Sequence, residues 1–222
     1  MRQGSQERSF LINHFRYFPV FIDLRGKRCV VVGGGRIASR KVTALLLSGA
    51  NVTVISPSVT GVLQEYCERK RIKHIRRKYR KGDLEDTFLT VAATLDRQVN
   101  REVSNDAPCL INAADDPGLC NFIVPSVVKR GYLTIAVSTS GTSPQMAKSI
   151  RKELEQFYGR EFGLFGRFLK EQRDKLKEDI SDDRARQRLM KKIAGPEMVK
   201  TLREKGFERT KVLVRKILKE SL

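Results

Sequence analysis

Residues 30–41 carry the clearest structural signal in the chain: Val30-Val31-Val32-Gly33-Gly34-Gly35-Arg36-Ile37-Ala38-Ser39-Arg40-Lys41. A run of β-branched residues stops at three glycines and a helical pattern follows at once, which predicts a strand, a tight turn and a helix. Gly33, Gly35 and Ala38 occupy the three fixed positions of G-x-G-x-x-A. That pattern lets the backbone approach a phosphate group at the N-terminus of a helix. A plain turn between a strand and a helix can carry the same glycine pattern. The surrounding sequence therefore has to distinguish a phosphate-binding turn from a plain one.

The segments around the glycines alternate between strand and helix patterns. A strand is predicted at 28–32, a helix at 37–47 and a second strand at 51–56, which together form one βαβ unit. Shorter segments continue the alternation: a helix at 59–67, a strand at 72–75, a turn of helix at 83–86, a strand at 88–93, a helix at 96–105 and a strand at 109–114. This order predicts an α/β fold with a Rossmann-like parallel sheet, whose ligands bind at the carboxyl ends of the strands. These ends are Gly33, Ser56, Thr94 and Asp115.

The pattern changes after residue 118. Two strand-like segments, 122–128 and 133–138, flank Lys129-Arg130-Gly131 and predict a β-hairpin outside the parallel sheet. Ser143 followed by Pro144 predicts the start of a helix, because serine caps a helix and proline suits its first position. The remaining chain is helical and charged, with breaks predicted near Gly159, Ser181, Gly195-Pro196 and Gly206.

The chain is strongly basic. Its 222 residues include 44 lysines and arginines against 25 acidic residues, for a formal net charge of +19. Such a charge fits nucleic acid, an anionic membrane surface or a polyanionic small molecule as partner. The excess is spread nearly evenly along the chain. The one dense basic cluster, residues 69–81, lacks a helix-turn-helix signature and aromatic interleaving, which argues against nucleic acid.

No apolar run approaches about 18 residues, and residues 1–8 are polar. We therefore expect no membrane span, no signal peptide and a cytoplasmic location. The cysteines never form C-x-x-C, which favours core thiols over a zinc or disulfide framework. They are Cys29, Cys67, Cys109 and Cys120.

Further motifs follow one another in unbroken order. They are Phe18-Pro19-Val20-Phe21, Ala92-Ala93-Thr94, Asn112-Ala113-Ala114-Asp115-Asp116-Pro117, Asn121-Phe122-Ile123-Val124-Pro125-Ser126 and Ser138-Thr139-Ser140-Gly141-Thr142-Ser143-Pro144. With the glycine turn and Lys41, they make the chain resemble the siroheme-synthase dehydrogenase/ferrochelatase family over roughly residues 17–160. An ordered series of motifs is far more specific than one glycine turn.

The resemblance implies an activity, a cofactor and a layout. The family's enzymes oxidise precorrin-2 to sirohydrochlorin with NAD, and some members also insert ferrous iron, so Fe²⁺ is a second substrate to test. The family's layout implies an NAD-binding Rossmann-like domain at 1–117, a dimerisation segment at 118–150, and a helical domain with a basic tail at 151–222. It also implies a homodimer. The substrate is a polyanionic tetrapyrrole, which agrees with the basic composition.

The resemblance also suggests site residues. Asp115 stands where the family has its important aspartate, and we expect it to act as general base; the alternative is that it only caps a turn before Pro117. We expect Asp116 to be a turn residue. The predicted cofactor-binding residues are Gly33, Gly35, Arg36, Ile37, Ser56, Pro57, Ser58 and Thr94. The predicted substrate-binding residues are Asn121, Phe122, Ser138, Thr139, Ser140, Thr142 and Ser143.

Several alternatives stay open. Ser56 stands where NAD-binding chains carry Asp or Glu, so NADP is not excluded as the nucleotide. The hydroxyl-rich 138–144 loop is either a substrate contact or a simple helix cap. The two histidines, His14 and His74, are expected at the surface, and no His/Cys cluster predicts a metal site. The competing functions are a dehydrogenase without chelatase activity and a non-catalytic Rossmann-like module that binds a tetrapyrrole or nucleic acid.

Overall fold

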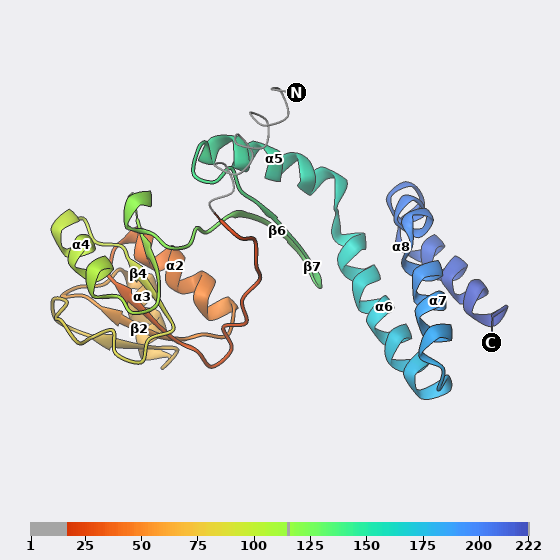
Figure 1. Cartoon of the computed structure of the whole chain (residues 1–222), viewed down its shortest axis with the longest axis horizontal. Helices are drawn as coiled ribbons and strands as arrows, with labels where there is room; N and C mark the ends of the chain where they lie inside the picture. Colours follow the sequence, from red (N-terminus) through yellow and green to blue (C-terminus); the bar gives the residue numbers. More distant parts are fainter. Residues whose placement is uncertain (1–16, 115, 222) are drawn as a thin grey trace, which may run out of the picture. The chain divides into compact units, whose positions relative to one another are not determined.

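The computed structural model describes residues 17–114 and 116–221. The chain divides after Val124 into two compact units, each of which is described by itself below (Figure 1). Asp115, the predicted base, and His14 lie outside the described residues, as does most of the predicted N-terminal arm.

The first unit is built on a five-stranded parallel sheet. Its strands are β1 (Arg28–Val32), β2 (Asn51–Ile55), β3 (Ile72–Ile75), β4 (Leu89–Ala92) and β5 (Leu110–Ala113). They lie in the order β3-β2-β1-β4-β5, with every neighbouring pair parallel. The order reverses at β1, which places the switch point of the sheet beside the glycine turn.

Helices cover both faces of the sheet. On one face, alternate residues of β1, β2 and β4 form a core with helices α2 (Arg36–Leu47) and α3 (Gly61–Glu68). The other residues of these strands, with those of β5, form a second core that includes Val103 of helix α4 (Arg97–Asp106). Because strands buried on both faces read as continuous apolar runs, the sequence predicted these strands well. A short 3-10 helix, η1 (Pro117–Leu119), follows β5.

The second unit begins with a hairpin and continues as helices. Strands β6 (Ser126–Arg130) and β7 (Leu133–Val137) pair antiparallel across a turn at Gly131, where φ is +57°. Four helices follow: α5 (Pro144–Phe157), α6 (Arg160–Asp179), α7 (Asp183–Ala194) and α8 (Pro196–Lys219). Residues of α6, α7 and α8 share an apolar core rich in Phe and Leu. Gly206 interrupts α8 with a φ of +73°.

The predicted fold class, the Ser143 cap and the four helix breaks are confirmed. The hairpin is confirmed too, but its first strand begins at Ser126 rather than at 122 and includes Lys129 and Arg130, which were expected in the turn. The predicted helical turn at 83–86 is wrong, because these residues form non-helical turns. Gly82 and Asp86 adopt left-handed backbone angles there, and Arg77 binds the Asp83 carboxylate at 2.6 Å. His74 is not a plain surface residue either: it is half-buried, and its Nε2 lies 2.9 Å from the carbonyl oxygen of Ser56.

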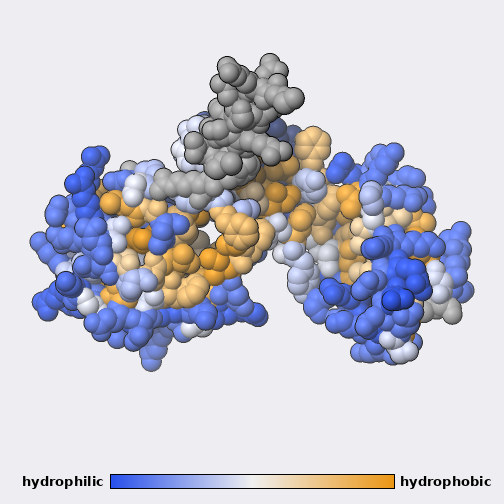
Figure 2. Space-filling view, viewed as in Figure 1, coloured by the Kyte–Doolittle hydropathy of each residue, from blue (hydrophilic) through white to orange (hydrophobic). Residues whose placement is uncertain are grey.

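All four cysteines are free; Cys29 and Cys120 are buried, whereas Cys67 and Cys109 are half-buried. Among the described residues, no helix is long and apolar enough to span a membrane. The surface is mainly hydrophilic around both units, and apolar patches interrupt it (Figure 2). Exposed apolar side chains include Phe18, Phe21, Val127 and Tyr132.

Candidate active site

The glycine turn between β1 and α2 is shaped differently at each glycine. Gly33 has a φ of +120°, and a Cβ there would lie 2.3 Å from the carbonyl oxygen of Ala93. A Cβ on Gly34 would lie 1.9 Å from the carbonyl oxygen of Ser58. A Cβ on Gly35 would meet nothing within 4 Å. Gly33 and Gly34 therefore let the turn pack against its neighbours, whereas Gly35 faces open space.

The start of α2 is suited to binding an anion, and no acidic side chain of its own first turn occupies that place. Gly35 is its N-cap and supplies no side-chain cap, and the first turn contains no acidic residue. The first N–H groups of the helix, together with its dipole, favour a negative group in the open space beside Gly35.

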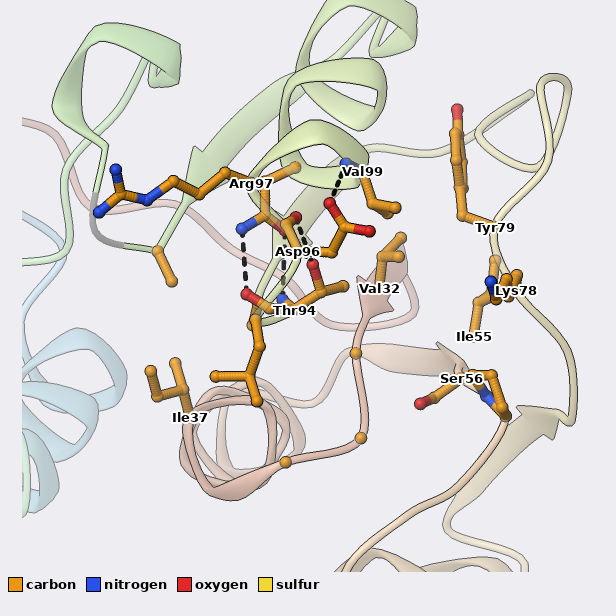
Figure 3. Close-up of a pocket in the computed structure, with 18 of the residues that line it drawn as sticks. Val32, Ile37, Ile55, Ser56, Lys78, Tyr79, Thr94, Asp96, Arg97 and Val99 are labelled. Atoms are coloured by element: carbon orange, nitrogen blue, oxygen red, sulfur yellow. Dashed lines mark hydrogen bonds between the residues drawn. The ribbon is translucent and has the colours of Figure 1, made fainter.

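A cavity of about 1140 Å³ opens at this turn. It lies at the carboxyl ends of β1, β2 and β4, next to Ala114 beyond β5. Figure 3 shows Thr94 and Asp96 on one side of this pocket and Ser56, Lys78 and Tyr79 across from them. The pocket thus occupies the crevice predicted from the strand ends.

One wall is held by a hydrogen-bond network around Thr94. The Thr94 hydroxyl lies 2.8 Å from the Oδ1 of Asn100 and 2.8 Å from the carbonyl oxygen of Asp96. The Nδ2 of buried Asn100 donates to the Thr94 carbonyl at 3.1 Å. The Asp96 carboxylate caps α4 by accepting the N–H groups of Gln98 and Val99 (Figure 3). These hydrogen bonds join the end of β4 to the first turn of α4 along this wall.

The opposite wall joins the end of β2 to the segment after β3. The Ser56 hydroxyl donates to the Ser58 carbonyl at 2.7 Å, and His74 holds the Ser56 carbonyl. The Tyr79 hydroxyl donates to the Oδ2 of Asp106 at 2.9 Å. Burial, together with this hydrogen bond, raises the pKa of Tyr79, so it stays a neutral donor at any physiological pH.

The chemistry of the lining fits a dinucleotide. The pocket combines the uncapped helix start with the cationic side chains of Arg36, Lys78, Arg97 and Arg101, which suit a diphosphate. At the end of β2 it offers Ser56 rather than a carboxylate, and that hydroxyl is already bound to Ser58. The site therefore has the parts that hold phosphates, and it lacks the acid that usually selects NAD over NADP.

The pocket gathers every predicted cofactor residue: Gly33, Gly35, Arg36, Ile37, Ser56, Pro57, Ser58 and Thr94. Sequence reasoning missed Lys78, Tyr79, Asn100, Arg97 and Arg101. The spacing of Arg97 and Arg101, four residues apart on one helix, was the available signal for those two.

The predicted substrate residues fall into two groups. In the first unit, the Asn121 side chain accepts the N–H of Ile111 in β5 and donates to the carbonyl of Cys109 just before that strand. The carbonyl of Phe122 accepts from Asn112. Asp116 caps η1 through the N–H of Gly118, as expected of a turn residue.

The hydroxyl-rich loop belongs to the second unit. The Ser143 hydroxyl accepts the N–H of Met146 at 3.2 Å, the Thr139 hydroxyl bonds the backbone of Ser143, and the Ser138 hydroxyl accepts the N–H of Ser140. Ser140 and Thr142 are exposed. The loop is therefore a self-bonded helix start with exposed polar groups.

The chain matches two protein-family models, one after the other along the sequence. Residues 20–126 match the family described as putative NAD(P)-binding, and residues 130–156 match the family described as the central part of a sirohaem biosynthesis protein. These two matches cover the glycine turn, the pocket and most of the hairpin and α5.

Similar chains carry related names. A siroheme synthase of Methylobacillus flagellatus is 40% identical over 171 residues, which are 76% of this chain and 37% of that protein. A siroheme synthase of Nitrosococcus oceani is 36% identical over 181 residues, covering 80% and 39%. The chain thus spans just under two fifths of the length of these curated relatives.

Among solved structures, SirC, a precorrin-2 dehydrogenase, is 28% identical with a TM-score of 0.76. The match covers 90% of this chain and 100% of that one. With the tandem families and the siroheme synthases, it shows that the chain belongs to the siroheme-synthase family, in the part that comprises the putative NAD(P)-binding and central regions.

Proposed function

We propose that this chain oxidises precorrin-2 to sirohydrochlorin with NAD⁺. One observation carries the proposal: a pocket lined by an uncapped helix start and cationic side chains lies at the switch point of a sheet, in a chain whose fold parallels that of SirC. The likeness to SirC runs over that protein's entire length, so it includes the hairpin and the helices as well as the nucleotide domain.

In this proposal, one set of residues binds the nucleotide and another residue accepts the proton. A bound NAD⁺ would supply the acceptor for a hydride that leaves a carbon of the macrocycle. Gly35 and the first N–H groups of α2 hold the diphosphate, and the cationic side chains of Lys78 and Arg97 neutralise it. Asp115 accepts the proton that leaves the macrocycle, because it follows directly after the β5 end of the crevice.

Substrate recognition rests on charge and on the 138–144 loop. Precorrin-2 carries many carboxylates, which a chain of net charge +19 attracts. The exposed hydroxyls of Ser140 and Thr142 and the N-terminus of α5 bind one of these carboxylates. Asn121 and Phe122 contribute from the segment after β5 in this proposal.

The test is an anaerobic assay of purified protein with precorrin-2 and either NAD⁺ or NADP⁺, followed by NADH or NADPH formation and sirohydrochlorin absorbance. We expect nucleotide-dependent formation of sirohydrochlorin. No nucleotide-dependent change would remove the enzyme proposal and leave the binding module. A second arm adds Fe²⁺ after oxidation: faster siroheme formation than without protein assigns iron insertion as well, and an unchanged rate leaves a dehydrogenase alone.

We further propose a homodimer in which residues 118–150 form the dimerisation segment between the domains at 1–117 and 151–222. The β6–β7 hairpin exposes Val127 on β6 and Tyr132 in its turn, and exposed apolar side chains of this kind suit a contact between two chains. Light scattering should give twice the chain mass. Val127→Lys should weaken the dimer, whereas Val212→Lys, at an exposed apolar site on α8, should not. A monomeric wild-type chain would contradict the proposal.

A cytoplasmic location is proposed from the free thiols.

A further inference from the structure

Lys41 is a charged side chain that the proposed reaction leaves without a role. It lies on α2, one turn beyond the residues that face the nucleotide, and it is half-buried. Its Nζ donates to the Oδ1 of Asn112 on β5 at 3.0 Å. In the described part of the chain, no carboxylate lies within ion-pair distance of it, and burial lowers its pKa. An apolar side chain of equal length would be cheaper to bury here.

Asn112 links Lys41 to the residues after β5 through further hydrogen bonds. Buried Asn112 donates through Nδ2 to the carbonyl of Phe122 at 3.2 Å and lies 3.6 Å from the Sγ of Cys120. The buried Cys120 thiol in turn accepts the N–H of Ala113 at 3.2 Å and donates within 3.2 Å of the carbonyl of Asp116. The thiol thus holds Ala113 and Asp116, the residues two before and one after Asp115 in the sequence.

We propose that Lys41 is a positioning residue that ties the nucleotide-binding helix α2 to Asn112 on β5 and, through Asn112, to Ala113 and Asp116, which flank the proposed base in the sequence. This rests on the proposed function. The lysine suits the task because an ammonium forms a stronger hydrogen bond to the Asn112 oxygen than a neutral donor does. It also spans from helix to strand, so that α2 and the end of β5 move together.

Hydrogen–deuterium exchange tests the contact without any substrate. In Lys41→Met, peptides covering 110–120 should exchange about tenfold faster, because local opening of that segment becomes easier. Peptides covering 51–56 should be unchanged. Asn112→Ala should speed exchange at least as much, because it also loses the bond from Nδ2 to the Phe122 carbonyl. The double variant should add little to Asn112→Ala alone, because Lys41 has then already lost its partner. Arg40→Met, at the exposed neighbour on α2, is the matched control and should behave as wild type. Unchanged exchange in Lys41→Met would overturn the proposal.

Kinetics separate positioning from binding. Lys41→Met should bind the nucleotide with wild-type affinity and keep KM for it, while kcat falls about 10- to 100-fold, because small misplacements of reacting groups are that costly. A loss confined to nucleotide affinity would assign Lys41 to binding and contradict positioning. If the wild-type chain shows no nucleotide-dependent oxidation, the proposed function fails, and the exchange comparison still decides whether Lys41 holds segment 110–120.

Discussion

At the scale of single residues, the proposed chemistry depends on Asp115. Asp115→Asn removes the base and keeps the side-chain size, so we expect turnover to fall by about 10² to 10⁴. Nucleotide affinity should not change, because the proposed phosphate-holding groups are Gly35, the start of α2, Lys78 and Arg97. NADH formation and a nucleotide titration measure the two. Asp116→Asn is the neighbouring control, since that carboxylate only caps η1. Full activity in Asp115→Asn would show that Asp115 is not the base.

Adjacent glycines of the turn should respond in opposite ways. Gly34→Ala forces a methyl group against the Ser58 carbonyl, so it should lower the melting temperature or prevent folding. Gly35→Ala meets no protein atom and loses only an N-cap preference, so it should lower the melting temperature far less than Gly34→Ala, yet it should weaken nucleotide binding because its methyl group enters the phosphate space. Thermal unfolding and nucleotide titration distinguish the two. A stable Gly35→Ala with undiminished affinity would place the phosphates elsewhere.

At the scale of elements, the start of α5 offers a separable test. Ser143→Ala removes the cap on Met146, and we expect the free energy of unfolding of the second unit to fall by about 1 kcal/mol. Ser149→Ala, at an exposed position inside α5, should be neutral or slightly stabilising. Urea unfolding checks both. A raised KM for the tetrapyrrole in Ser143→Ala would add a substrate contact, whereas an unchanged KM leaves Ser143 as a cap.

The helices and strands could be predicted from the sequence wherever neighbouring residues determine the local structure. Apolar runs marked the buried strands, and Ser143, Gly195-Pro196 and Gly206 marked helix ends and breaks. The turn at 83–86 was not predictable, because Arg77 and left-handed backbone angles override the helical pattern there.

The site was predictable from the sequence only in part. The strand ends and the glycine turn follow from the βαβ pattern. The part of the pocket formed by that turn and by the start of α2 could therefore be predicted from the sequence. Lys78 and Tyr79 reach the pocket from the segment after β3, and Lys41 reaches Asn112 across 71 positions of sequence. Such contacts arise from tertiary packing, which no local pattern encodes.

At the scale of the whole molecule, the net charge of +19 should govern substrate capture. We expect kcat/KM for the tetrapyrrole to fall steeply as salt rises from about 50 mM to about 500 mM, because screening shortens the range of attraction. Turnover at saturating substrate should change little, because capture no longer limits it. Stopped-flow binding at several salt concentrations measures the effect, with an esterified tetrapyrrole as the uncharged control. Salt-independent capture would mean that the charge serves another purpose.

The basic cluster 69–81 has a further consequence through β3, which forms one edge of the sheet and pairs only with β2. Such an edge presents free backbone groups to which a second chain can add a strand. Lys73 on this strand is exposed, as are Arg71 and Arg76 at its ends, so two such edges repel each other. We therefore expect the cluster to disfavour pairing of β3 with the same edge of a second chain.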